Sequence, residues 1–378
     1  MKEKMSVRFV SNRLTWHQVP LSDALFELSQ DYRFIAAEEI PEDRKEAYPP
    51  CDDYAYFRQG AAADELNTDV VIIGSAPDKL IAPRLKAKKL TFKYSERLYK
   101  DGLTVRNYWH AMAGAWLHHG RFQKHPLYLL CASAFTSADC AKFGLYKNRA
   151  YKWGYFPEMK TYDPEELLQK KTPSTILWCG RLLEWKHPDD AITVAAALKK
   201  AGYSFRLEII GDGEMGNKIA DMIAENDLAD CVTMPGAKPT NEVRSHMESA
   251  GIYLFTSDRK EGWGAVLNEA MNSGCAVVAS HAIGAVPYMI KDGENGYVYH
   301  SGNVEELCRK VMYLLDHPSE QQRLGRAAYD TIAGEWNAEV AARRVIELSE
   351  HILAGEKSPD LFQSGPCSKA EIIKDDWY

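Results

Sequence analysis

The sequence predicts an α/β protein with two parallel-sheet domains, and three observations support this. Short apolar runs bounded by turn residues alternate with helical patterns, as do the strands of a buried parallel sheet and the helices that cover it. A polar stretch at 157–174 interrupts the alternation, which then starts again. Two such blocks around one linker favour two Rossmann-like domains that face each other across a cleft.

The first block supplies the strand candidates of a domain that we expect to cover residues 1–160. Helical patterns lie between them, for example at 22–30, 78–89 and 134–144. The strand candidates are residues 7–11, 32–38, 69–75, 90–96, 127–133 and 150–156.

The second block repeats the pattern, and we expect its domain to cover residues 161–335. Its helical patterns include 187–202 and 242–250. A further helix at 336–356 could pack back on the first domain, and 357–378 is a polar tail that we expect to be loosely held. The strand candidates are residues 175–180, 205–211, 231–236, 251–257, 275–280 and 296–300.

Composition and charge exclude several classes of protein. The 378 residues carry a formal net charge of −7, which argues against broad binding to nucleic acid. The eight cysteines are scattered without a C-x-x-C pair, so we expect reduced thiols, no metal site and a cytoplasmic protein. The N-terminus lacks the pattern of a signal peptide, and no stretch approaches the roughly 18 apolar residues of a membrane span.

A G-x-G-x-x-G motif at Gly211, Gly213 and Gly216 raises one alternative function. It follows a strand candidate and opens an amphipathic helical pattern, which is the order of a dinucleotide-binding unit. Such a unit also needs an acidic residue at the end of the next strand, but the candidate at 231–236 ends in Met-Pro-Gly. An NAD-dependent oxidoreductase is therefore a disfavoured alternative. The glycines indicate a tight turn that can line a nucleotide pocket.

The stretch 257–280 carries the strongest functional signal. Gly262 and Gly264 precede a short predicted helix, where free backbone N–H groups and the helix dipole attract anions. Glu261 in the loop can face the cleft. Glu269, eight residues further on, can hold ribose hydroxyls. Each glutamate taken alone also fits a simpler role, as a helix cap or as part of a solvated face.

Two cations follow the first strand candidate of the second block. Arg181 and Lys186 come just past its carboxyl end, at the expected mouth of the cleft. They suit a diphosphate leaving group, since arginine offers a fork of donors and lysine a point charge. Taken alone, they could equally be a solvated basic turn.

Three segments together resemble the retaining GT-B glycosyltransferases of family four. They are GRLLEWKHPDDAI from Gly180, IIGDGE from Ile209 and EGWGAVLNEAMNSGCAVVAS from Glu261, and Glu261 with Glu269 fits the E-x7-E motif of that family. The resemblance covers about 176–330. The N-terminal half is similar to bacterial capsular and exopolysaccharide glycosyltransferases, although it lacks the glycine-rich loop that many members carry after the first strand.

The resemblance implies a nucleoside-diphosphate sugar donor, with UDP-sugar expected, that is held by the second domain without a metal ion. It implies phosphate contacts and catalytic roles for Arg181 and Lys186, ribose contacts for Glu269, and a catalytic contact with the donor sugar for Glu261. The further donor contacts implied are Gly180, Gly211, Gly213, Ala237, Gly262, Trp263, Gly264, Ala265 and Val266.

The implied acceptor is a saccharide or a lipid-linked saccharide. His17 follows the first strand candidate and is a candidate for acceptor binding and catalysis, while Glu96 after the fourth is a candidate acceptor contact. A structural histidine and a salt-bridged glutamate are the simpler alternatives. The basic and aromatic run 106–125 is expected to pack as core, in preference to peripheral contact with the inner face of a membrane. A non-catalytic sugar-nucleotide-binding subunit stays open as a second alternative function.

Overall fold

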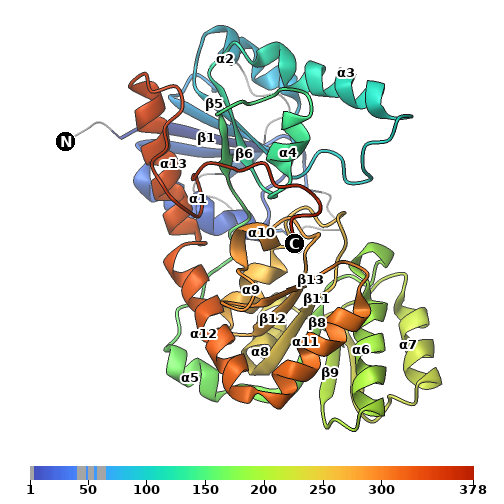
Figure 1. Ribbon diagram of the computed structural model, residues 1–378. Coiled ribbons are helices and arrows are strands. Elements are labelled where there is room, and N and C mark those ends of the chain that lie inside the picture. The colour runs from blue at the N-terminus through green and yellow to red at the C-terminus, as the bar shows by residue number, and fades with distance from the viewer. Residues whose placement is uncertain (1–3, 41–47, 50–54, 58–64) are drawn as a thin grey trace. The chain divides into compact units, whose positions relative to one another are not determined.

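The computed structural model describes residues 4–40, 48–49, 55–57 and 65–378 (Figure 1). The chain divides into two compact units. The first consists of Met1–Glu158 and Trp336–Lys374, and the second of Met159–Glu335 and Asp375–Tyr378. Each unit is built on one sheet in which every neighbouring pair of strands is parallel.

The first unit has a seven-stranded sheet in the order β3-β2-β1-β4-β5-β6-β7. Strands β4 and β6 are buried along their whole length, which explains why they read as continuous apolar runs in the sequence. The order reverses direction at β1, so β4 pairs with β1 although β2 and β3 separate them in the chain. The bounds are β1 Ser6–Ser11, β2 Asp31–Ala36, β3 Ala55–Phe57, β4 Val70–Ile73, β5 Thr91–Ser95, β6 Leu127–Cys131 and β7 Ala150–Lys152.

The helices of the first unit include the last long helix of the chain. Helix α13 packs against α1 within this unit, as Figure 1 shows. The other helices are short, apart from α3. The bounds are η1 Trp16–Gln18, α1 Val19–Leu28, η3 Asp78–Leu80, α2 Ala82–Lys86, α3 Tyr108–His118, η4 Gly120–Phe122, α4 Thr136–Ala141 and α13 Ala338–Leu353.

The tail after α13 is held on the first unit as far as Lys374, which corrects the expectation that it is loose. Its backbone pairs with edge strand β7: the N–H of Cys367 donates to the carbonyl oxygen of Lys152 (2.8 Å), and the N–H of Lys152 donates to that of Ser368 (2.8 Å). Both Cys367 and Ser368 are buried. An edge strand offers unpaired main-chain groups whatever its side chains are. The polar composition of the tail therefore gave no sign of this pairing.

The second unit has a six-stranded sheet in the order β10-β9-β8-β11-β12-β13. Its first strand, β8, lies between β9 and β11, so the direction of winding reverses there. Strands β11 and β12 are buried throughout. The bounds are β8 Thr172–Cys179, β9 Arg206–Ile210, β10 Val232–Gly236, β11 Ala250–Phe255, β12 Ala276–Ser280 and β13 Tyr297–Tyr299.

Helix α5 lies inside the polar stretch that the sequence indicated as a linker. The carboxylate of Asp163 caps it by accepting from the N–H groups of Glu165 (2.9 Å) and Glu166 (3.1 Å), and Pro164 opens it. Since the first unit ends at Glu158 and the second begins at Met159, the stretch belongs mostly to the second unit. The helices of this unit are α5 Pro164–Gln169, η5 Glu184–Lys186, α6 Pro188–Lys200, α7 Gly216–Glu225, α8 Thr240–Ser249, α9 Val266–Asn272, α10 Val286–Met289, α11 Val304–Asp316 and α12 Pro318–Gly334.

The first two glycines of the G-x-G-x-x-G motif let two loops meet backbone to backbone. Gly211 has φ 147° and Gly213 has φ 156°. A Cβ on Gly211 would lie 1.8 Å from the carbonyl oxygen of Gly180, and one on Gly213 would lie 2.5 Å from that of Leu182. The N–H of Leu182 donates to the carbonyl oxygen of Asp212 (2.8 Å). These glycines therefore fix the loop after β9 against the loop after β8.

Replacing Gly211 by alanine should destabilise the protein by about 3 kcal/mol or more, because the new Cβ overlaps backbone that cannot move aside. Gly202 is the matched control. It also has a positive φ (83°), but a Cβ there would meet no atom within 4 Å, so Gly202→Ala should cost only about 1 kcal/mol. Urea unfolding of both variants measures the difference. Equal losses would contradict the close approach of the two loops.

Candidate functional site

The predicted donor-site residues come together at the carboxyl edge of the second sheet. Lys186 follows β8, Gly211 follows β9, Ala237 follows β10, and Glu261 and Glu269 follow β11. These four strands are parallel neighbours, so the loops after them share one edge. Ligands of open α/β sheets bind at this edge where the strand order reverses, which here is between β8 and β11.

An ion pair between Lys186 and Glu261 joins the loops after β8 and β11. Lys186 Nζ lies 2.5 Å from Glu261 Oε2, and the two side chains are 13% and 12% exposed. Ser257 Oγ donates to the same carboxylate oxygen (3.1 Å), and the ammonium lies 4.5 Å from the centre of the Trp185 ring. The two charged candidates neutralise each other, so an anion that binds Lys186 competes with Glu261.

Backbone and side-chain hydrogen bonds hold this pair in place. The hydroxyl of Thr256, just after β11, donates to the carbonyl oxygen of Lys186 (2.7 Å) and accepts from the indole N–H of Trp178 (2.8 Å). The N–H of Asp258 donates to the carbonyl oxygen of Trp185 (2.9 Å). The two loops therefore form one hydrogen-bonded layer over the edge of the sheet.

Arg181 lies in the same loop as Lys186 but differs from it in two ways. Its side chain is exposed. This side chain also makes no ion pair or hydrogen bond with any residue in the part of the chain that the structure describes. Its guanidinium is therefore available to an anionic ligand at once, whereas Lys186 must first release Glu261.

Glu269 is partly buried on α9 without a protein donor for its carboxylate. Among the described residues no side chain or backbone N–H donates to its carboxylate, although Arg244 Nη1 donates to its backbone carbonyl oxygen (3.3 Å). Burial raises the pKa of Glu269, and the nearby Arg244 opposes this rise. A desolvated carboxylate without hydrogen bonds is costly unless a ligand supplies the donors.

Trp263 does not present its side chain at this edge. Its indole is fully buried and donates to Asn268 Oδ1 (2.9 Å), so only its backbone can reach a ligand. The neighbouring Gly264 has φ 87°, and a Cβ there would lie 2.4 Å from the Phe255 ring. In the described ranges no acceptor pairs with the backbone N–H of Gly262 or of Gly264. Ala265 and Val266 follow at the start of α9 and are partly buried.

A carboxylate cluster that the sequence analysis did not single out lies directly after Lys186. Candidate ligand atoms of His187, Asp189 and Asp190 lie within 4.8 Å of one another. Lys218 Nζ donates to Asp189 (2.8 Å), and burial raises the pKa of Asp190 to about 6. Both aspartates lie in the first turn of α6, where the helix dipole favours negative charge. Lys218 and the helix terminus already balance these carboxylates, so the cluster does not by itself indicate a metal site.

The two acceptor candidates lie close together in the first unit, with Tyr155 between them. The hydroxyl of Tyr155 donates to Glu96 Oε1 (2.6 Å), and its ring centre lies 4.4 Å from that of His17. Lys100 Nζ pairs with the other oxygen of Glu96 (2.6 Å). Sequence reasoning missed Tyr155. Its place at the end of the strand candidate 150–156, at the same sheet edge as His17 and Glu96, was the available signal.

His17 is neutral at physiological pH. Burial lowers its pKa to about 4, with the charge of Glu96 acting in the opposite direction. Its Nε2 lies 3.1 Å from the hydroxyl of Thr15. A neutral imidazole can exchange hydrogen bonds with a hydroxyl, but it supplies no charge.

Most of the basic and aromatic run 106–125 does not pack as core, which corrects the expectation for α3, although Ala115, His119 and Phe122 are buried. Ala115 is the buried residue of α3, while Trp109 and Trp116 are exposed. The indole rings lie on the side of the helix away from Ala115, which packs into the core of the unit. Among the described helices none is both long and apolar enough to cross a membrane.

Residues 159–331, within the second unit, match the family model described as glycosyl transferases group 1. The amylovoran biosynthesis glycosyltransferase AmsK of Erwinia amylovora is 31% identical over 185 residues, which are 48% of this chain and 45% of that protein. The putative colanic acid biosynthesis glycosyltransferase WcaL of Escherichia coli strain K12 is 26% identical over 197 residues, which are 50% and 48%. The chain thus spans about half the length of these curated relatives.

Solved structures share the fold over most of the chain. Anabaena HepE, crystallised in complex with UDP, gives a TM-score of 0.68 at 13% identity and covers 92% of this chain and 100% of that one. A glycosyltransferase from Rickettsia africae ESF-5 gives 0.69 at 14% identity, with 94% and 100% covered. At such identities the likeness concerns the fold alone. The predicted α/β class with a GT-B fold is confirmed.

Glu269→Gln should stabilise the second unit more at pH 8 than at pH 5. The folded-state pKa of Glu269 lies above its unfolded value, so its contribution to stability is present at low pH and is lost as the pH rises through the folded pKa. Glutamine is nearly isosteric and removes the buried charge, for a gain of about 1 kcal/mol at pH 8. Melting temperatures of wild type and variant between pH 5 and 8 measure this.

Glu305→Gln is the control, because that carboxylate is 85% exposed in an i,i+4 pair on α11. The stability difference between the control variant and wild type should not change with pH. If the difference for Glu269→Gln does not change with pH either, the desolvation cost assigned to the Glu269 carboxylate is contradicted.

Proposed function

We propose that this chain is a retaining glycosyltransferase. It would move a sugar from a UDP-sugar donor to a saccharide or lipid-linked saccharide acceptor in bacterial polysaccharide biosynthesis. The observation that carries the proposal is the gathering of Arg181, the Lys186–Glu261 pair and Glu269 at the switch point of the second sheet. Support also comes from the group 1 domain at 159–331, from relatives named for exopolysaccharide biosynthesis, and from a structural neighbour that binds UDP.

Binding of the donor would replace the ion pair that Lys186 makes with Glu261 in the unligated protein. The diphosphate binds the unpaired guanidinium of Arg181 and draws Lys186 away from Glu261, which is then released toward the donor sugar. Glu269 accepts hydrogen bonds from the two ribose hydroxyls. Each bond of this charge-assisted kind contributes about 1.5–3 kcal/mol. The base lies toward the loops after β9 and β10, where Gly211 and Gly213 keep the backbone close.

Stabilisation of the leaving group would be the main catalytic contribution of these residues. Negative charge grows on the diphosphate as its bond to the anomeric carbon breaks. Arg181, Lys186 and the free N–H groups of Gly262 and Gly264 oppose that charge from fixed positions. This assignment needs no metal ion. Retention of the anomeric configuration is what the resemblance to family four implies. In such a reaction the acceptor oxygen bonds to the anomeric carbon on the face that the diphosphate leaves, and the acceptor proton passes to a phosphate oxygen.

The acceptor would bind the first unit at His17 and Glu96. A neutral imidazole and a carboxylate held by Tyr155 and Lys100 can both hydrogen-bond to sugar hydroxyls. A lipid-linked acceptor would also favour contact of the protein with a membrane.

Arg181→Ala should lower turnover of a UDP-sugar about 100-fold, with a smaller loss of UDP affinity, because Arg181 acts on charge that develops in the transition state. Its melting temperature should equal that of wild type, since the side chain is exposed. UDP release measures turnover across a panel of UDP-sugars and saccharides, and proton NMR reads the anomeric configuration of the product. Arg206→Ala, an exposed arginine at the opposite end of β9, is the control.

Wild-type turnover in Arg181→Ala would overturn the role of that residue. A product with inverted configuration would overturn the retaining mechanism. Loss of turnover in EDTA would overturn the metal-free assignment.

A further inference from the structure

Helix α3 turns Ala111 and Ala115 toward the protein and its large apolar side chains toward solvent. Ala115 is buried and Ala111 and Gly114 are partly buried, whereas Trp109 and Trp116 are 69% and 63% exposed. The spacing of Trp109 and Trp116, with an exposed methionine between them at 112, places the three on one face of the helix. A surface helix of a soluble protein normally shows the opposite arrangement.

Exposed apolar side chains are concentrated at this one place. Eleven large hydrophobic residues are exposed in the part of the chain that the structure describes, and six of them fall within 105–117. We call these six the α3 surface: Val105, Tyr108, Trp109, Met112, Trp116 and Leu117. Contiguous exposure of this kind marks an interaction site, whereas single exposed residues do not.

The outward orientation of α3 is fixed by its polar contacts with the rest of the unit. His118 Nδ1 lies 2.6 Å from Asp78 Oδ2, and Lys93 Nζ donates to Asp78 Oδ1 (2.6 Å) and to the carbonyl oxygen of His118 (3.1 Å). His119 Nδ1 lies 2.7 Å from the hydroxyl of Tyr146. Figure 1 shows the helix at the rim of the first unit. The helix is therefore anchored with its indoles outward.

The charge around the α3 surface is basic, although the chain as a whole carries −7. No aspartate or glutamate occurs between Asp101 and Asp139. Arg106 precedes the helix and Arg121 and Lys124 follow it, all three exposed and without an ion pair to any described residue. In a two-fold contact between copies of this chain, these cations would face one another, and the carboxylate that contacts the helix, Asp78, is already paired with Lys93 and His118. An anionic surface has the complementary charge.

We infer that the α3 surface docks onto an anionic lipid bilayer. Trp109, Met112 and Trp116 enter the interface, where indole rings are favoured, and Arg106 and Arg121 bind headgroup phosphates. This inference does not depend on sugar transfer, because it concerns only the surface of the first unit. The hydroxyl of Tyr99, in the loop after Glu96, donates to the carbonyl oxygen of Ala111 (3.4 Å), so docking would bring that loop close to the membrane.

Flotation of the full chain with lipid vesicles tests the inference. Wild type should bind vesicles of phosphatidylcholine with phosphatidylglycerol, and bind pure phosphatidylcholine weakly. The double variant Trp109→Ala/Trp116→Ala should lose binding about tenfold or more. The double variant Arg121→Gln/Lys124→Gln should lose about fivefold per charge on anionic vesicles only. The second variant changes exposed side chains alone, so it keeps the test valid if the first fails to fold.

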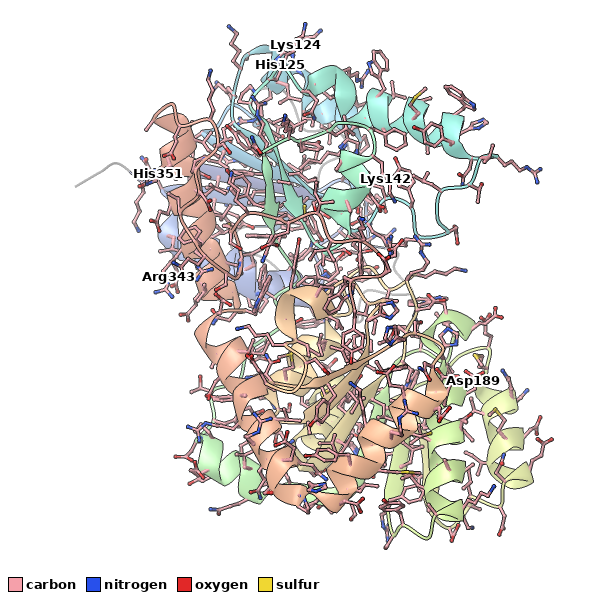
Figure 2. The ribbon with its side chains drawn as sticks, in the orientation of Figure 1. Lys124, His125, Lys142, Asp189, Arg343 and His351 are labelled. Carbon is pink, nitrogen blue, oxygen red and sulfur yellow. The ribbon has the colours of Figure 1, made fainter. Side chains whose placement is uncertain are left out.

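Matched controls come from the far side of the same unit. Figure 2 shows Lys124 at the top of the unit and Arg343 on α13, well separated from it. Leu353→Ala, whose side chain is 49% exposed on the same helix, and Arg343→Gln should bind vesicles as wild type does.

Three results would overturn the inference. One is wild-type binding in the tryptophan variant at an unchanged melting temperature. Another is failure of wild type to bind anionic vesicles. The third is a concentration-dependent dimer that the tryptophan substitutions abolish, because a second copy would then cover the surface. UDP binding read separately by thermal shift distinguishes all three from a failure of the proposed transferase function.

Discussion

The order of strands in the second sheet is the constraint on which the candidate site depends. Because β8 lies between β9 and β11, chain segments about 75 residues apart end side by side, and Lys186 reaches Glu261 (2.5 Å). Thr256 ties the two loops together through the carbonyl oxygen of Lys186. The positions of Arg181 and Glu269 follow from the same arrangement. A change in strand order would separate all four charges, whatever their local sequence.

The charged groups at this edge are balanced to different degrees. Lys186 and Glu261 satisfy each other, Arg181 is solvated, and Glu269 is desolvated without a donor. In the unligated protein the desolvated carboxylate of Glu269 therefore lowers the free energy of unfolding, and a ligand with several hydroxyl groups could remove this cost. An anion could likewise displace Glu261 from Lys186. Such sites lower stability in favour of binding. The backbone contact of Gly211 with Gly180 fixes the loop after β9 against the loop after β8 at the same edge.

The sequence predicted those features of the structure that depend on the local pattern of residues. It did not predict features that depend on main-chain pairing or on contacts between residues far apart in the chain. Apolar runs predicted the strands of both sheets apart from β3, and the glycines of the loop after β9 were correctly interpreted as a tight turn. The indole of Trp263 could not be placed, because a tryptophan in a glycine-rich loop can face a ligand or the core. Tail pairing with β7 needs no side-chain signature. The run that contains α3 was expected to pack as core, yet the large side chains of this helix face solvent.

The most direct test of the account is hydrogen exchange of the full chain with and without UDP. Slower exchange should concentrate in 180–187 and 257–272, the two segments that carry Arg181, Lys186, Glu261 and Glu269. The segment 206–216 should be slowed less. Slowing confined to the first unit, or no change at UDP concentrations that saturate a thermal shift, would contradict the placement of a nucleotide at the switch point of the second sheet.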